Sequence, residues 1–293
     1  MLSNGKICVL ENEYLYVRVA SVGAALLSAK SKKYGDFLLH MGDDDFSEGY
    51  VGKVIAPWVN RVKNGEYCVN NYKYNLPIND FETNSALHGL VAWQNFSIVS
   101  LTCDSVMFEY DLYPSPSFPF KVNIRVEYIL REDKLISNIV ATNLGDSKCP
   151  IGLCAHPYLY YCGSASIDEC KIIVDGMSKE NNSEFFTYSH NGEVTIDLEN
   201  TCLDNCFKSS GEWKVCFEKK HFNKADSENN SLHKIFFASN SKFFHFYTGE
   251  CVERTALAVE PCTTNAGVFG DVDKGDFIMP NESKYLSYAI WAE

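Results

Sequence analysis

The stretch "FKVNIRVEYILREDKLISNIVATN", residues Phe120–Asn143, decides the fold of this chain. Apolar and polar side chains alternate through both of its halves, and a polar Arg-Glu-Asp triplet separates the two. Valine, isoleucine and tyrosine favour extended backbone, and a period of two places alternate side chains on one face. We therefore predict two β-strands here, each with one buried face.

Segments of the same kind recur along the whole chain. Gly, Asn, Asp, Ser or Pro residues separate them, and helical periodicity does not extend beyond about two turns. Many short strands with turns between them are typical of a large antiparallel β-sandwich or barrel. Neither a break in composition nor an internal repeat divides the chain, so we predict one all-β domain over residues 1–293. The further strand segments include "CVLENEYLYVRVAS", "SVMFEYDLY", "KIIVDG", "EVTIDL", "WKVCFEK", "KIFFAS", "FFHFYTG", "TALAVEP" and "KYLSYAIWAE".

Composition limits the kinds of molecule that this chain can bind. Of 293 residues 46% are hydrophobic, which is enough for a substantial core. The net charge of -12 argues against nucleic acid or an anionic membrane, since both require a basic face. The N-terminus lacks the basic-then-apolar order of a signal peptide, and no apolar run approaches the roughly 20 residues that cross a bilayer. We expect a cytoplasmic monomer or homodimer.

The twelve cysteines do not form a recognisable framework. They include no CxxC pair and no Cys/His spacing suited to zinc. We therefore expect reduced thiols that pack as small apolar side chains in a cytosol, and no metal site.

Two reactive groups stand beside prolines in apolar runs. His156 precedes Pro157 in "IGLCAHPYLYY", and Glu260 precedes Pro261 in "LAVEPCTTNAGVF". Proline cannot donate to a ladder, so we expect each strand to stop at its proline. A core histidine bonded to a carbonyl, and a carboxylate ending an edge strand, would explain each group separately.

Three further polar groups share this kind of setting. Arg61 lies in "IAPWVNRVKNGEY", His88 precedes Gly89 in "SALHGLVAW", and Asp204 lies in "TCLDNCF". At Gly89 a backbone can approach a ligand closely, while Arg61 and Asp204 could instead serve a surface ion pair and a turn. Because charged groups are costly in apolar surroundings, a shared polar cleft explains all five residues together. Two imidazoles, two carboxylates and a guanidinium suit acid–base chemistry, and no G-x-S-x-G nucleophile motif is present.

These motifs, with "FPFKVNIRVEYIL" and "VEPCTTNAGVF", resemble in order and spacing the aldose 1-epimerase (mutarotase) family, from about Gly23 to the C-terminus. The resemblance implies a β-supersandwich of the galactose mutarotase type. It also implies interconversion of the α and β anomers of a free aldose, a small-molecule sugar as partner, and neither cofactor nor metal.

The resemblance also implies catalytic roles. Glu260 matches the general base that removes the anomeric proton, and His156 matches the general acid that protonates the ring oxygen. His88 matches a second histidine that polarises the ring oxygen. We expect base and acid on opposite sides of C1, with a nearby carboxylate holding His156 as imidazolium.

Substrate binding is assigned to the other matching positions. Arg61 and Asp204 match residues that hold sugar hydroxyls, and Asn60 belongs to the same "NRV" motif as Arg61. Two departures bear on the choice of sugar. "HPY" is followed by Leu159, Tyr160 and Tyr161 rather than Phe-Asn-Leu, and "HGLVAW" replaces the "HGFAR" of the phosphosugar branch, which counts against a sugar phosphate.

Other functions remain open at this point. A carbohydrate-binding module without catalysis would need the aromatic residues and Arg61, but not both His156 and Glu260. An epimerase of sugar phosphates or other modified sugars is a second alternative. A retaining glycosidase could use Asp204 with Glu260, provided that the carboxyls lie roughly 5–5.5 Å apart. A metal site of His88, His156 and Glu260 would lack the H-x-H spacing of cupins.

Overall fold

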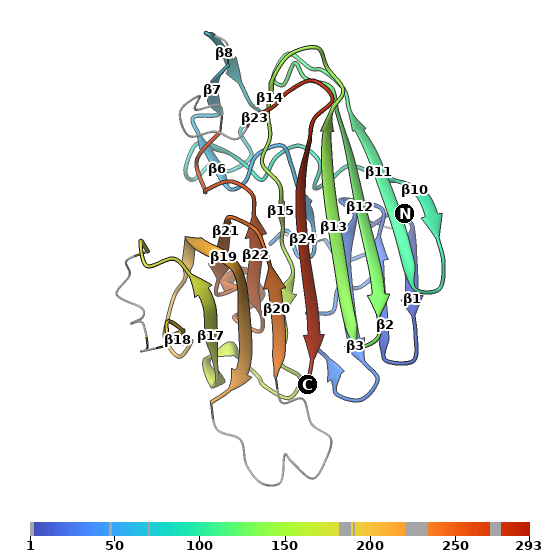
Figure 1. Cartoon of the computed structure of the whole chain (residues 1–293), viewed down its shortest axis with the longest axis vertical. Coiled ribbons are helices and arrows are strands. Elements are labelled where there is room, and N and C mark those ends of the chain that lie inside the picture. The colour runs from blue at the N-terminus through green and yellow to red at the C-terminus, as the bar shows by residue number, and fades with distance from the viewer. Residues whose placement is uncertain are drawn as a thin grey trace.

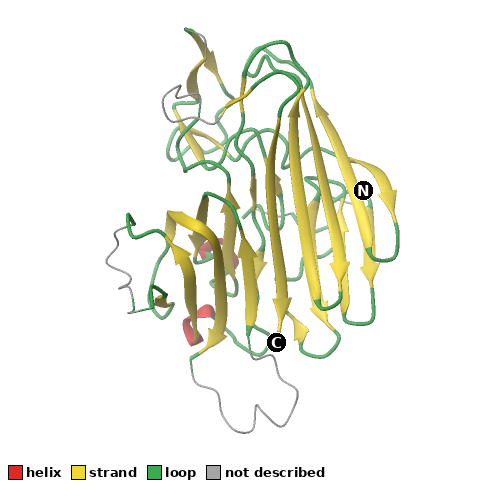
Figure 2. Cartoon of the chain, in the orientation of Figure 1, coloured by secondary structure: helices red, strands yellow, loops and turns green. Residues whose placement is uncertain are grey.

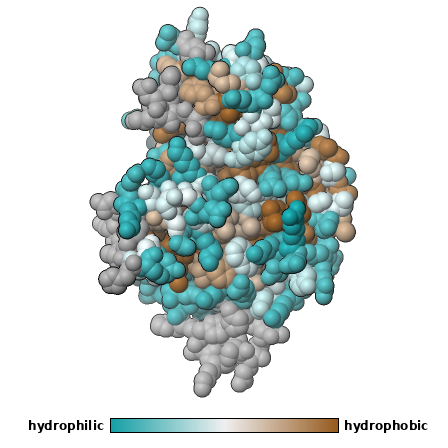
Figure 3. Space-filling view, in the orientation of Figure 1, coloured by the Kyte–Doolittle hydropathy of each residue, from teal (hydrophilic) through white to brown (hydrophobic). Residues whose placement is uncertain are grey.

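The computed structural model describes residues 3–46, 49–69, 71–181, 189, 191–220, 234–269 and 277–293. The predicted all-β class is confirmed, since the described residues form strands and two 3-10 turns, η1 (Ile167–Glu169) and η2 (Glu250–Val252) (Figure 2). Neither turn, nor any other described helix, has the length and apolar character to span a bilayer. On the face in Figure 3 hydrophilic residues predominate, and apolar residues form patches between them.

The stretch Phe120–Asn143 forms the predicted pair of strands. β12 (Val122–Arg131) and β13 (Lys134–Asn143) pair antiparallel, from Val122 opposite Asn143 to Arg131 opposite Lys134. Their burial alternates along the chain, because each has one face in the core. Only two residues connect them, and the first, Glu132, has a φ of 52°, as tight hairpin turns require.

These two strands belong to the largest sheet, which has fourteen strands among the described residues. Its main path runs in the order β10 (Ser97–Leu101), β11 (Ser105–Leu112), β12, β13, β24 (Ser283–Ala292), β20 (Ile235–Ser239), β19 (Asp204–Lys219), β21 (Phe243–Tyr247), β22 (Leu257–Cys262), β15 (Cys154–Ala155) and β5 (Val54–Ile55). Three strands lie off this path: β16 (Tyr158–Leu159) pairs with β22, β17 (Cys170–Met177) pairs with β19, and β18 (Val194–Asp197) pairs with β17.

Strand β19 joins the two layers of the sandwich. Residues 204–208 pair with β21, whereas residues 213–217 pair with β20, so the strand passes from one layer to the other. In Figure 1 β21 and β22 lie behind β20 and β24, and β22 contacts β24. The layer that contains β19, β21, β22 and β15 carries the candidate site.

Smaller sheets complete the sandwich. The four-stranded sheet packs against β12, where the Tyr128 hydroxyl donates to the Ala24 carbonyl at 2.8 Å. One cluster of buried apolar side chains, with members from Cys8 to Ala292, forms the core. The sheets are β1 (Ile7–Glu11), β2 (Leu15–Ala20), β3 (Ala25–Ser31) and β4 (Gly35–Asp36); β6 (Arg61–Lys63) with β9 (Ser85–Leu87); β7 (Glu66–Val69) with β8 (Tyr72–Asn75); and β14 (Cys149–Pro150) with β23 (Phe277–Ile278).

The two prolines singled out in the sequence behave differently. β15 ends at Ala155 and β16 begins at Tyr158, so the interruption predicted at Pro157 is confirmed. The prediction that β22 stops at Pro261 is wrong, because Pro261 lies opposite Phe244 and the strand continues to Cys262. The N–H groups of residues 259 and 263 point toward residues 157 and 153. The nitrogen of Pro261, midway between, therefore faces the gap between β15 and β16, where no ladder donor is needed.

Candidate active site

All six residues assigned to the site from the sequence line one cavity of about 250 Å³. The structure thus brings together side chains that are up to 200 positions apart in the chain. Three larger hollows, of about 460, 660 and 340 Å³, contain no histidine in their linings. The lining of the site comprises Gly49, Tyr50, Asn60, Arg61, Leu87, His88, His156, Tyr158, Asp204, Tyr247, Cys251 and Glu260.

The base and acid candidates are in direct contact. His156 Nε2 lies 3.4 Å from Glu260 Oε1, and the two side chains are only 5% and 3% exposed. Glu260 sits in mid-strand in β22, while His156 occupies the gap after β15, where its N–H donates to the Lys53 carbonyl at 3.0 Å. The Tyr158 ring stacks on the imidazole with 5.2 Å between centroids. The two groups therefore lie side by side in the ligand-free site.

A neighbouring histidine is paired with both carboxylates of the site. His245, on β21, is the register partner of Glu260, and its Nε2 lies 2.7 Å from Asp204 Oδ1. Burial acts to lower the pKa of His245, but the Glu260 carboxylate and the hydrogen bond with Asp204 outweigh burial and leave the pKa raised. The sequence interpretation missed this residue. Its signal was the central histidine of the apolar strand "FFHFY", the same kind of signal that singled out His156.

His156 itself differs from expectation. Burial lowers its pKa below the ordinary value, and the opposing field of Glu260 only partly compensates. This lowering opposes the predicted imidazolium, whereas the predicted carboxylate neighbour is present. Burial, followed by the field of His156, lowers the pKa of His88 well below its usual value. Both His88 and His156 have a buried Nδ1 atom without a hydrogen-bond partner in the described part of the chain.

A left-handed turn places His88 beside the cavity. His88 and Gly89 have φ values of 59° and 73°. A Cβ on Gly89 would lie 2.0 Å from the Ala56 carbonyl oxygen. Gly89 therefore allows the chain to approach the Ala56 backbone closely. The His88 ring packs against Tyr50 at 4.7 Å and against His156 at 5.3 Å.

Arg61 is held between two carboxylates. Its Nε lies 2.7 Å from Asp80 Oδ2, and a terminal nitrogen lies 3.6 Å from Asp204 Oδ2. Asp80 was not predicted from the sequence. The hydrogen bond from His245 lowers the pKa of Asp204, against the effect of burial, and Arg61 adds to the lowering. The side-chain oxygen of Asn60 accepts the Arg61 main-chain N–H at 2.8 Å. The main-chain carbonyl of Asn60 accepts the His88 main-chain N–H at 3.1 Å.

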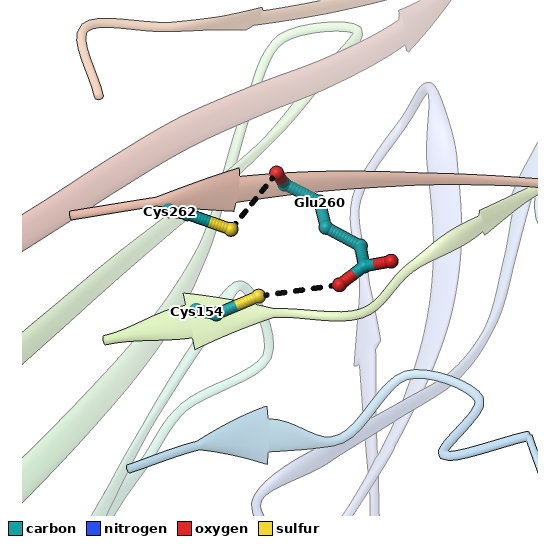
Figure 4. Close-up of side chains that lie close together, drawn as sticks. All are labelled: Cys154, Glu260 and Cys262. Carbon is teal, nitrogen blue, oxygen red and sulfur yellow. Dashed lines mark hydrogen bonds between the residues drawn. The ribbon is translucent and has the colours of Figure 1, made fainter. Parts of the chain in front are cut away.

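Two thiols lie against Glu260 (Figure 4). The Cys154 thiol donates to Glu260 Oε2 at 3.6 Å, and the Cys262 thiol donates to the Glu260 main-chain carbonyl at 3.4 Å. Within the described ranges, this trio is the grouping of potential metal ligands that the structure assembles. The alternative set of His88, His156 and Glu260 is not assembled in this way.

Comparison with known proteins gives a consistent picture. The profile of the aldose 1-epimerase family matches residues 6–274. The uncharacterised protein YihR of Escherichia coli K12 is 29% identical over 264 residues, which cover 86% of this chain and 82% of YihR.

Two solved structures share the fold. A GalM/aldose epimerase homologue from C. elegans has a TM-score of 0.75 at 16% identity, covering 98% of each chain. A galactose 1-epimerase from Lactobacillus acidophilus NCFM has a TM-score of 0.74 at 16% identity, covering 100% of this chain and 96% of that one. At these identities the likeness establishes the architecture.

Proposed function

The chain belongs to the aldose 1-epimerase family, and we propose that it interconverts the α and β anomers of a free aldose by acid–base ring opening and closure. The observation that carries this proposal is the buried 3.4 Å contact between Glu260 and His156 at the wall of a small polar cavity. A cavity of about 250 Å³ is below the range of about 300–1,000 Å³ typical of drug-sized ligands. It suits a single sugar ring.

The chemistry follows from the side-by-side arrangement. O1 and O5 of a pyranose are bonded to the same carbon, so adjacent base and acid atoms can reach both oxygens at once. Glu260 accepts the O1 proton while the imidazolium form of His156 protonates O5 and becomes neutral, and the C1–O5 bond breaks to give the open-chain aldehyde. After rotation about C1–C2 the roles reverse and O5 attacks the other face of C1. Each proton transfer contributes about 10²–10⁴ in rate.

The remaining polar residues bind the sugar hydroxyls or compensate the charge of Glu260. Arg61, Asp204 and Asn60 present donors and acceptors for sugar hydroxyls, and His88 offers a neutral imidazole near the ring oxygen. His245 does not line the cavity. We assign it the positioning role of holding Asp204 and of compensating the buried negative charge of Glu260.

The charges around the cavity favour an unphosphorylated sugar. Among the described lining residues, Arg61 carries the only guanidinium or ammonium group. Asp80 and Asp204 already engage that group. A phosphate would therefore find no free cation in this lining. All twelve cysteines are unpaired, which supports the cytoplasm as the site of action.

The contact between Glu260 and His156 also separates the proposal from its rivals. A binding module has no use for a buried base–acid contact beside a ligand cavity. A retaining glycosidase needs carboxyls about 5–5.5 Å apart. Asp204 and Glu260 lie on β19 and β22, which β21 separates in the sheet, so the two carboxylates do not come from neighbouring strands.

The decisive experiment is polarimetry on freshly dissolved α-glucose, α-galactose, xylose and arabinose. We expect faster anomer exchange on at least one of them. The substitution Glu260→Gln should lower kcat by about 10²–10⁴ while sugar binding, measured by calorimetry, persists. The exposed Glu13→Gln is the matched control and should keep full activity. Full mutarotation by Glu260→Gln would refute the catalytic assignment.

A further inference from the structure

The anomer-exchange mechanism leaves two buried thiols at the base unused. Cys154 and Cys262 are register partners on β15 and β22, and neither side chain is exposed. With the Glu260 carboxylate they form a set whose three ligand atoms all lie within 4.8 Å of one another (Figure 4). The sequence spacing gives no hint of this set, because 106 residues separate Cys154 from Glu260.

The geometry is close to that of a coordination site for a soft ion. Zn²⁺ binds thiolates at about 2.3 Å and carboxylate oxygens at about 2.0–2.2 Å, in tetrahedral arrangement. Ligand atoms around such an ion are therefore about 3.3–3.8 Å apart. The 3.6 Å between Cys154 Sγ and Glu260 Oε2 already falls in this range, and rotation of the short cysteine side chains would close the rest.

The charge balance favours exchange of protons for a divalent ion. In the empty site both thiols carry their protons, since the Cys154 thiol donates to Glu260 Oε2 and the Cys262 thiol donates to the Glu260 main-chain carbonyl. A divalent ion displaces both thiol protons, because a coordinated thiol is deprotonated. Two protons leave as two positive charges arrive, and the net charge of the buried cluster does not change. The usual electrostatic cost of burying an ion is thereby largely avoided.

The ion has a route to the site. Glu260 lines the cavity, whereas Cys154 and Cys262 contact Glu260 from outside the lining. An ion that enters through the cavity meets the carboxylate first and the two thiols behind it. Three protein ligands leave a fourth tetrahedral position for a water molecule.

We propose that Cys154, Cys262 and Glu260 form a binding site for a thiophilic divalent ion of the Zn²⁺ or Cd²⁺ class, and that the bound ion inhibits the enzyme by engaging the base. The inhibitory part rests on the proposed anomer exchange, and the binding part does not. Inhibition is reversible, because a chelator restores two thiols and a free carboxylate.

Binding is tested with Cd²⁺ on the reduced, chelator-treated full chain. Cadmium–thiolate absorption in the ultraviolet, equilibrium dialysis and proton release are compared for wild type, Cys154→Ser, Cys262→Ser and the control Cys8→Ser, a buried cysteine outside the trio. We expect one tight ion and two released protons per chain in wild type and control. Loss of a ligand should weaken that site by about a hundredfold. Equal binding by wild type and both single variants would overturn the proposal. Circular dichroism verifies that the variants fold. If only one of the two ligand variants folds, that variant is sufficient to test the site.

Inhibition is measured separately, with each variant normalised to its own metal-free rate. We expect the wild-type and Cys8→Ser rates to fall in proportion to cadmium occupancy and to recover with chelator. The rates of Cys154→Ser and Cys262→Ser should resist the same cadmium concentrations. Full activity at full occupancy would overturn the inhibitory role. Absence of metal-free activity on every aldose would refute the proposed function, while the binding measurements would still decide whether the site exists.

Discussion

The charge of His245 provides a quantitative test of the site's electrostatics. His245→Gln removes the imidazolium but keeps an amide N–H that can donate to Asp204. Glu260, buried with 3% of its side chain exposed, then loses its cross-strand cation. For directly opposed partners we take a charge separation of about 5.5 Å, the upper end of the usual spacing between their Cβ atoms. At an effective dielectric of about 20, the Coulomb energy is about 3 kcal/mol.

A double-mutant cycle isolates this energy. The free energy of unfolding in urea is measured at pH 6 for wild type, His245→Gln, Glu260→Gln and the double variant, with chelator present. We expect a coupling of about 1–3 kcal/mol, because the substitution at His245 costs less once the carboxylate is gone. A parallel cycle of His245→Gln with the exposed Glu13→Gln should be additive.

The same cycle has a defined pH dependence. The pKa of His245 is raised in the folded state, so its contribution to stability is complete below the ordinary imidazole pKa of about 6.5. The contribution is then lost as the pH rises through the higher pKa of the folded state. We therefore expect the coupling to shrink between pH 6 and pH 9. Additivity within about 0.5 kcal/mol at pH 6 would show that Glu260 does not feel the charge of His245, and would refute this reasoning.

Two further predictions concern the loop and the acid. Gly89→Ala, whose Cβ would lie 2.0 Å from the Ala56 carbonyl oxygen, should lose about 2 kcal/mol or more in urea unfolding and also lose activity. Gly163→Ala, at a φ of 90° with nothing within 4 Å, should lose only about 1–2 kcal/mol, and equal losses would contradict the steric argument. Because burial lowers the pKa of His156, its protonated form is lost at a lower pH than that of an ordinary imidazole. We therefore expect kcat/KM, measured with chelator, to decline as pH rises through a value below about 6.5. A profile that stays flat to pH 8 would argue against His156 as the acid.

The strands were readable from local sequence because alternation is a local property. A residue's hydrophobicity and its parity along the strand decide which face it occupies, as in β12 and β13. The interruption at Pro157 followed from the same reasoning. The strand end predicted at Pro261 was wrong. Whether the N–H that a proline lacks would have been needed depends on which strands lie on either side of it.

Periodicity predicted the fold class and the two strands within Phe120–Asn143, and motifs that resemble a known family singled out the six residues that line the cavity. Only the tertiary structure revealed the cation at His245, the partnership of Asp80 with Arg61 and the two thiols against Glu260. Each of these depends on the register between strands distant in sequence. It also decided the direction in which the pKa of His156 moves, because burial, a property of the packed fold, lowers that pKa more than the field of Glu260 raises it.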